Sequence, residues 1–255
     1  MSVGELSVVV HRDADVLAAA AAARLLVKIV DAQHARGSAS VVLTGGGVGI
    51  GTLRALAASP ARDAIDWGTL DVWWGDERYL PPGHPERNDV QAREALLDAV
   101  PVDPARVHPM PADTGADPDD AAGQYAEELA KAARSGAALP TFDVLLLGVG
   151  PEGHIASIFP ESPAAYDERR VCAVRNCPKP PPTRVSLTFP TITSADEVWL
   201  LAAGTGKAEA VGLALTGTGR VQIPAAGARG GIRTLWLLDE AAAVRVPPEL
   251  KARRN

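Results

Sequence analysis

Short apolar runs alternate with longer segments of helical periodicity along this chain. The apolar runs are continuous rather than alternating, which is typical of parallel strands buried on both faces. We expect strands at Ser7–Val10, Ser40–Leu43, Leu70–Trp74, Phe142–Leu147, Val171–Val174, Arg184–Leu187, Glu197–Ala202 and Thr234–Leu238. Because helical segments separate most of them, the pattern predicts an α/β fold with a mostly parallel sheet covered on both faces.

Helices are expected in the longer segments between the apolar runs, where apolar residues recur with helical spacing. Asp13 predicts the start of the first one, because an aspartate side chain can accept a hydrogen bond from the first turn. Asn88 or Asp89 could serve a later helix in the same way. The predicted helices are Ala14–Arg36, Thr52–Ala58, Val90–Ala99, Pro118–Arg134, a segment from the GTGK sequence to about Leu215, and a terminal helix beginning at Glu240–Ala243.

Composition narrows the class of protein. The chain has 255 residues, of which 47% are hydrophobic and 22% charged, as in globular proteins with a sizeable core. Its formal net charge is −6 and it has no basic stripe, which argues against a nucleic-acid partner. No apolar run approaches the roughly 20 residues of a membrane span, and the N-terminus does not resemble a secretory signal. We therefore expect a cytoplasmic protein that binds neither nucleic acid nor membrane.

The two cysteines, Cys172 and Cys177, are expected to be unpaired thiols in a reducing compartment. Their C-x4-C spacing is not that of a usual zinc pair, and no other residues supply the remaining ligands. The motifs G-x-S-x-G, H-E-x-x-H and C-x-x-C are also missing from the sequence. Serine-hydrolase, zinc-protease and thioredoxin-like chemistry therefore has no support.

A glycine-rich segment, Thr44–Gly51 (TGGGVGIG), lies between a predicted strand and a predicted helix. Successive backbone N–H groups at the start of a helix can hold a phosphate. The segment is not a Walker A loop, because no Gly-Lys-Ser/Thr follows. Its five glycines in seven positions exceed what a tight turn requires, which favours an anion site.

The predicted strand Phe142–Leu147 ends at two glycines, and His154 follows closely. Ligands of open α/β sheets bind beyond the carboxyl ends of such strands, and an imidazole with a pKa of about 6.5 suits a general base. Residues 148–153 also match G-x-G-x-x-G. Pro151 within the motif and the missing acid at the end of the next strand argue against a dinucleotide site.

Charged residues follow another buried strand at Asp76, Glu77 and Arg78. Asp76 and Arg78 lie two positions apart and could face the same crevice as His154, whereas Glu77 is expected to be a solvated surface charge. Lys207, in the GTGK segment before a helix, suits a second contact with a phosphate.

Five segments together resemble the 6-phosphogluconolactonases, in the order of that family: LTGGGVGIG, WWGDERYLPPGHPERND, LLLGVGPEGHIASIFP, KPPPTRVSLTFPTI and GTGKAEAV. The resemblance spans about Val8 to Leu238. It implies one Rossmann-like three-layer α/β/α domain over residues 1–255, as a monomer or weak homo-oligomer. It also implies hydrolysis of 6-phospho-D-glucono-1,5-lactone to 6-phospho-D-gluconate, the second step of the oxidative pentose phosphate pathway, without a metal or organic cofactor.

The resemblance also implies roles for individual residues. His154 would be the catalytic base and Asp76 the acid that orients the histidine or the sugar hydroxyls. The substrate- or phosphate-binding residues would be Thr44, Gly45, Gly46, Gly47, Arg78, Lys207 and, more weakly, Arg184. The family often has Thr at the position of Ile155 and Asp at that of Glu152, so this chain lacks a hydroxyl beside the histidine.

Two alternatives stay open. A sugar-phosphate deaminase or isomerase of the same fold would carry a glutamate five residues after the histidine, where this chain has Phe159; Glu161 lies two residues further on. A non-catalytic sugar-phosphate sensor would keep the phosphate loop and lose catalytic groups that this chain retains. The proline-rich segment 176–183 is expected to move, because it carries Lys179 among prolines beside the presumed site.

Overall fold

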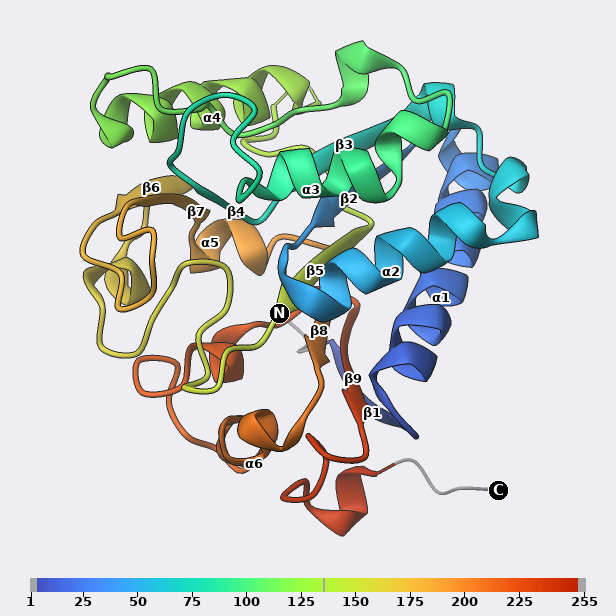
Figure 1. Ribbon diagram of the computed structural model, residues 1–255, viewed down its shortest axis with the longest axis vertical. Helices are drawn as coiled ribbons and strands as arrows, with labels where there is room; N and C mark the ends of the chain where they lie inside the picture. Colours follow the sequence, from blue (N-terminus) through green and yellow to red (C-terminus); the bar gives the residue numbers. More distant parts are fainter. Residues whose placement is uncertain (1–3, 135, 252–255) are drawn as a thin grey trace.

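The computed structural model, which describes residues 4–134 and 136–251, contains a six-stranded parallel sheet (Figure 1). Its order is β1-β9-β8-β5-β2-β3, and every neighbouring pair is parallel. The strands are β1 (Glu5–His11), β2 (Ala39–Leu43), β3 (Leu70–Trp74), β5 (Val144–Gly148), β8 (Glu197–Ala202) and β9 (Arg233–Asp239). The predicted parallel sheet and all six of its strands are confirmed.

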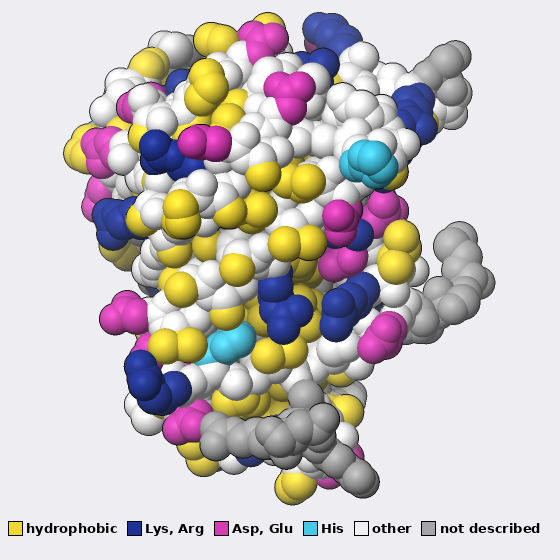
Figure 2. Space-filling view, turned by 90° about the vertical axis from the view of Figure 1, so that its right-hand side faces the viewer, with side chains coloured by type: hydrophobic (Ala, Val, Ile, Leu, Met, Phe, Trp, Pro, Cys, Tyr) yellow, Lys and Arg dark blue, Asp and Glu magenta, His cyan; other side chains and the backbone are white. Residues whose placement is uncertain are grey.

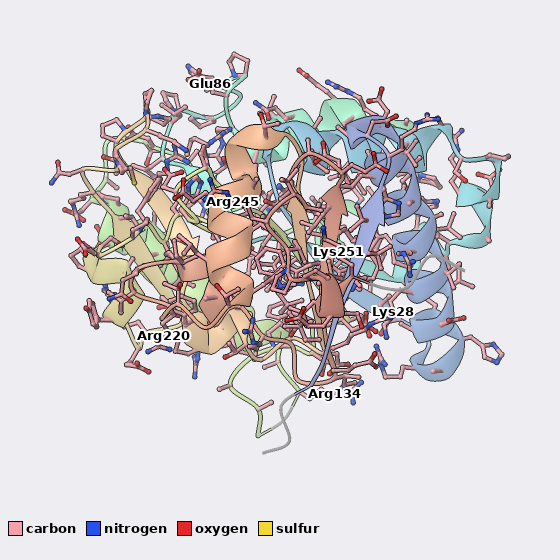
Figure 3. All side chains as sticks on the ribbon, turned by 90° about the horizontal axis from the view of Figure 1, so that it is seen from below. Lys28, Glu86, Arg134, Arg220, Arg245 and Lys251 are labelled. Atoms are coloured by element: carbon pink, nitrogen blue, oxygen red, sulfur yellow. The ribbon has the colours of Figure 1, made fainter. Side chains whose placement is uncertain are left out.

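Helices cover both faces of this sheet. The first face carries α1 (Ala14–Arg36), α2 (Gly46–Ala58) and α3 (Asn88–Ala95), and the second carries α4 (Pro118–Ala132) and α6 (Ala208–Leu215). Figure 3 shows α1 and α6 on opposite sides of the strands. Side chains of β5 alternate between the two apolar cores, which is why its sequence is a continuous apolar run.

The predicted starts of α1 and α4, which aspartate side chains cap, are confirmed, and those of α2 and α3 differ. Asp13 caps α1, since its Oδ1 accepts a hydrogen bond from the backbone N–H of Val16 at 2.8 Å. Helix α2 begins at Gly46, within the glycine run, and not at Thr52 as expected. The expectation that Asn88 or Asp89 caps α3 is wrong, because both are helical and their backbone N–H groups donate to the carboxylate of Glu77.

A second, three-stranded sheet lies beside the first and has the order β4-β7-β6 (Figure 1, left). Its antiparallel strands are β4 (Asp76–Arg78), β6 (Val171–Val174) and β7 (Arg184–Leu187), followed by the short helix α5 (Phe189–Ile192). The sequence predicts β6 and β7 but not β4. Gly75 connects the two sheets, since its N–H donates to Leu43 and its carbonyl accepts from Leu187.

Other expectations have mixed outcomes. The predicted terminal helix at Glu240–Ala243 is wrong: this segment is a turn whose Ala242 N–H donates to the Asp239 carboxylate, and only a short 3-10 turn follows at Pro248–Leu250. Cys172 and Cys177 are buried and unpaired, as expected.

In the described ranges, no helix is long and apolar enough to span a membrane. Figure 2 shows one face of the molecule, where basic and acidic side chains are interspersed.

Candidate active site

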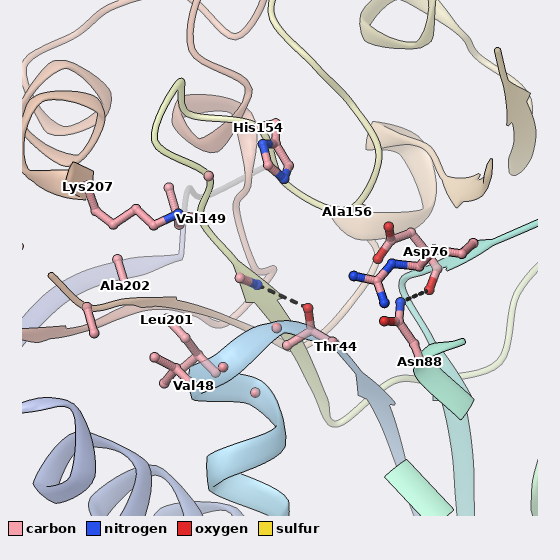
Figure 4. Close-up of a pocket in the computed structure, with 18 of the residues that line it drawn as sticks. Thr44, Val48, Asp76, Asn88, Val149, His154, Ala156, Leu201, Ala202 and Lys207 are labelled. Carbon is pink, nitrogen blue, oxygen red and sulfur yellow. Dashed lines mark hydrogen bonds between the residues drawn. The ribbon is translucent and has the colours of Figure 1, made fainter. Parts of the chain in front are cut away.

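A cavity of about 300 Å³ opens beyond the carboxyl ends of β2, β3, β5 and β8 (Figure 4). The chain leaves β2 toward one edge of the sheet and β5 toward the other, so the cavity lies at the switch point where α/β proteins bind ligands. All nine residues proposed from the sequence line it: Thr44, Gly45, Gly46, Gly47, Asp76, Arg78, His154, Arg184 and Lys207.

The glycine loop presents the start of α2 to this cavity. Gly45 precedes the helix, and no side chain in the described part of the chain caps it. Gly46 has a φ of 81°, which favours glycine, and space in front of Gly46 and Gly47 is open. Thr44 anchors the loop, because its Oγ1 accepts a hydrogen bond from Gly148 at 3.2 Å. The first N–H groups of α2 and the positive end of its dipole are therefore available to an anion.

His154 is held between an acid and an aromatic ring. Its Nδ1 lies 3.2 Å from Oε2 of Glu152, in a geometry that falls short of a hydrogen bond. Its ring stacks on Phe159 with a centroid distance of 4.5 Å. Gly150 makes room for this ring, since a Cβ there would overlap Nδ1. Burial lowers the pKa of His154 against the opposing effect of Glu152, which favours a neutral imidazole near pH 7.

Asp76, the first residue of β4, has partners other than the histidine. Its Oδ2 accepts a hydrogen bond from Ser157 Oγ at 2.6 Å and lies 3.8 Å from Nη1 of Arg184. Within the described residues, Glu152 is the carboxylate at ion-pair distance from His154. Asp76 is thus positioned to face a ligand, while Glu152 faces the imidazole.

Two basic side chains in the cavity have unused hydrogen-bonding capacity. Lys207 makes no ion pair or hydrogen bond through its amine with any described residue, and burial and the charge of Lys179 lower its pKa. Arg78 donates through Nη1 to the carbonyl of Glu86 at 2.6 Å, but its buried Nε has no partner. Burying unpaired donors costs free energy, so both groups are suited to receive an anionic ligand.

Arg184 is engaged differently. Its guanidinium donates through Nε to the carbonyl of Pro181 and through Nη2 to those of Lys179 and Pro180. Most of its donors therefore hold the proline-rich segment in place. The structure puts Arg184 in the cavity as expected but gives it fewer free donors than Lys207.

Sequence reasoning missed several residues around the cavity. The expectation that Glu77 is solvated is wrong: its side chain is buried, and it accepts from the backbone N–H groups of Arg78, Asn88 and Asp89. Strand alternation was the available signal, because Asp76 and Arg78 facing the cavity turn Glu77 the opposite way.

Asn88 is the second omission. It is 2% exposed, lines the cavity and donates through Nδ2 to the Asp76 carbonyl at 2.8 Å. Its Oδ1 occupies the space that a Cβ on Gly45 would take. Asn88 thereby packs the glycine loop against the strand that carries Asp76. Its sequence position after a proline-rich loop carries no signal of this contact.

Metal-binding side chains are not clustered here. In the two described ranges, no three or more His, Cys, Asp or Glu side chains are arranged to hold a metal ion. The chemical groups that line the cavity include an imidazole, the carboxylate of Asp76, three cationic side chains and backbone amides.

Comparison with known proteins matches this arrangement. The family model for glucosamine-6-phosphate isomerases and 6-phosphogluconolactonases matches residues 12–236. The chain belongs to this family. A 6-phosphogluconolactonase from Streptomyces coelicolor is 63% identical over 248 residues, covering 95% of each chain. One from Mycobacterium tuberculosis is 51% identical over 245 residues, covering 94% of this chain and 98% of the relative.

Solved structures of similar proteins have the same fold as this chain. The 6-phosphogluconolactonase from Trypanosoma brucei superposes with a TM-score of 0.81 at 28% identity, covering 96% of this chain and all of the other. A monomeric glucosamine-6-phosphate deaminase superposes with a TM-score of 0.78 at 20% identity, covering 94% of this chain and 99% of the other, which indicates a shared fold alone.

Proposed function

We propose that this protein hydrolyses 6-phospho-D-glucono-1,5-lactone to 6-phospho-D-gluconate. The observation that carries the proposal is that one cavity holds both a partly buried histidine and an uncapped helix start with an unpaired lysine beside it. A sugar-phosphate lactone has the two matching parts, an anion and an electrophilic carbonyl. The names of relatives at 51–63% identity support the same substrate.

The phosphate would bind at the glycine loop. Backbone N–H groups at the start of α2, together with Lys207, offer donors and positive charge on one side of the cavity. The negative charge of a bound phosphate would favour the ammonium form of Lys207 and so oppose the burial that lowers its pKa. This interaction is the same in the ground state and the transition state, so it serves affinity and orientation more than the chemical step.

His154 would act as the general base. Glu152 beside Nδ1 favours the tautomer with the proton on that atom, which leaves the Nε2 lone pair free. Nε2 takes a proton from water as its oxygen adds to the lactone carbonyl. The resulting imidazolium returns that proton to the ring oxygen as the C–O bond breaks, giving the carboxylic acid and a free hydroxyl.

Two further side chains would assist the reacting centre. Arg78, with an unpartnered Nε at the cavity, is placed to stabilise the oxyanion that forms on the carbonyl oxygen. Asp76, fixed by Ser157, would orient a sugar hydroxyl as an acceptor. These roles assign Asp76 to the substrate and Glu152 to the histidine.

A deaminase or isomerase activity has less support from the site. Phe159 occupies the position expected for the ring-opening glutamate and stacks its ring on His154. Glu161 is exposed and lies outside the residues that line the cavity. A sugar-phosphate sensor would not need a partly buried histidine with an acid 3.2 Å from its ring nitrogen.

The test is lactone hydrolysis with the lactone generated in situ from glucose 6-phosphate, after subtraction of spontaneous opening. Unphosphorylated gluconolactone serves as the control substrate. We expect rapid turnover of the phosphorylated lactone only. Turnover no faster than spontaneous opening would reject the lactonase proposal, and binding of 6-phosphogluconate without turnover would favour a sensor.

A further inference from the structure

The proline-rich segment 176–183 connects β6 to β7 and is held by hydrogen bonds from a residue that lines the candidate site. Arg184, at the start of β7, donates hydrogen bonds to the carbonyls of Lys179, Pro180 and Pro181 at 3.1–3.4 Å. The backbone N–H of Cys177 closes the segment by donating to Pro182 at 2.9 Å. Arg184 in turn lies 3.8 Å from Asp76. The segment is therefore braced against the strand that carries a proposed catalytic residue.

Lys179 makes a second connection, to the histidine side of the cavity. Its Nζ donates to Oε2 of Glu152 at 2.9 Å. The same oxygen lies 3.2 Å from Nδ1 of His154. One carboxylate oxygen is thus shared between a lysine on the proline-rich segment and the imidazole.

Partial burial strengthens this coupling. The side chains of His154, Glu152 and Lys179 are 17%, 32% and 40% exposed, so solvent screens their charges only partly. The charged groups that act on the imidazole are Glu152, Lys179 and Asp76, while Phe159 covers its ring. The negative charge of Glu152 favours the imidazolium form of His154. Lys179 opposes that form in two ways: its own positive charge repels the imidazolium, and its hydrogen bond and ion pair with Glu152 weaken the effect of the carboxylate.

We propose that Lys179 is a positioning residue that sets the proton affinity of His154 by sharing Oε2 of Glu152. The proposal rests on the proposed function in which His154 is the base. The ion pair between Lys179 and Glu152 keeps the imidazole neutral, so that Nε2 can accept a proton from water. Movement of segment 176–183 would break this ion pair and leave Glu152 to interact with His154 alone. The position of the segment would thereby change the proton affinity of the base.

The test compares three substitutions of Lys179. Lys179→Met removes both the charge and the hydrogen bond, Lys179→Gln keeps a donor without charge, and Lys179→Arg keeps both. Lys131→Met, which removes an exposed lysine of α4, is the matched control. The pKa of His154 is measured in each protein by NMR titration of the imidazole, and kcat/KM for the lactone is measured across the acidic limb of the pH profile.

We expect Lys179→Met to raise the pKa of His154 by on the order of half a pH unit, because it removes a nearby positive charge. At pH values well below that pKa, kcat/KM should fall about threefold relative to the unchanged protein, and the difference should vanish on the plateau above it. Lys179→Gln should follow Lys179→Met, and Lys179→Arg should restore the original profile.

An unchanged His154 pKa in Lys179→Met would overturn the proposal, even if activity fell, since that would leave Lys179 only a structural role. The NMR titration does not depend on turnover. If the protein lacked lactonase activity altogether, the titration would still decide whether Lys179 controls the histidine, and the two failures would be distinguishable.

Discussion

The two ends of the candidate site are built in different ways. The phosphate end consists of backbone N–H groups from consecutive residues at the start of α2, with Lys207 beside them. The chemical end consists of side chains from β4, the loop after β5 and the start of β7. Backbone donors tolerate changes of side chain that leave the loop conformation intact, whereas the chemical end depends on contacts between distant residues. The comparison predicts that changes at the first end raise KM and changes at the second lower kcat.

His154→Ala should have the largest effect. Removal of the general base is expected to lower kcat by about 10²- to 10⁴-fold, with little change in KM. Steady-state kinetics with the phosphorylated lactone measures both constants. If this variant kept more than about a tenth of the original kcat, the assignment of His154 as base would fail.

A matched pair of glycine substitutions tests directly whether the phosphate end governs KM and the chemical end governs kcat. Gly150→Ala would push a Cβ into Nδ1 of His154, so kcat should fall by on the order of 10²-fold through displacement of the base. Gly45→Ala would push a Cβ into Oδ1 of Asn88 and displace the phosphate loop, so its main effect should be a higher KM.

Asn88→Ala provides the control for this pair. In the Gly45→Ala background it removes the overlapping atoms and should recover part of the lost affinity, although it also removes the bond to Asp76. It should not recover the kcat of Gly150→Ala. Equal kinetic effects of the two glycine substitutions would contradict the proposed division of the site.

Lys207→Met should raise KM about tenfold to a hundredfold and leave kcat nearly unchanged. The lost interaction is a hydrogen bond to a charged group, worth roughly 1.5–3 kcal/mol. The rate with unphosphorylated gluconolactone should not respond to the substitution. A fall in kcat at unchanged KM would instead place Lys207 at the reacting carbonyl.

The smallest effect concerns pH. Burial lowers the pKa of His154 below its ordinary value of 6.5, so the base form persists below that pH. Because this pKa belongs to the free protein, kcat/KM should decline only as the pH falls through the lowered pKa. The unfolded chain binds this proton more readily than the folded one. His154 therefore contributes stability that is present above pH 6.5 and is lost as the pH falls.

Chemical denaturation between pH 5 and 8 measures the contribution to stability, with His154→Gln as the reference. The substitution should flatten the loss of stability on the acidic side. A kcat/KM that already declines above pH 7 as the pH is lowered would contradict the direction of the pKa shift.

Local sequence was sufficient for much of the fold and for the candidate residues. Continuous apolar runs predicted the strands of the parallel sheet, because strands buried on both faces need apolar side chains at every position. Asp13 predicted the start of α1 since a cap acts within one turn. His154 and the glycine loop were found because both follow directly on predicted strands, where α/β folds form their ligand sites.

Only the tertiary structure decided how these residues are paired. Lys179 meets Glu152 across 27 positions and Ser157 meets Asp76 across 81, and no local pattern encodes such contacts. The burial of Glu77 likewise depends on α3 packing its first N–H groups against β4. Local sequence determines which groups this protein offers to a ligand, because strand, turn and cap preferences act within a few residues. The packing of the two sheets decides that Asp76 meets Ser157 and Arg184, whereas Glu152 reaches the imidazole from only two residues before it. A carboxylate acts on whichever partners the fold brings within a few ångströms.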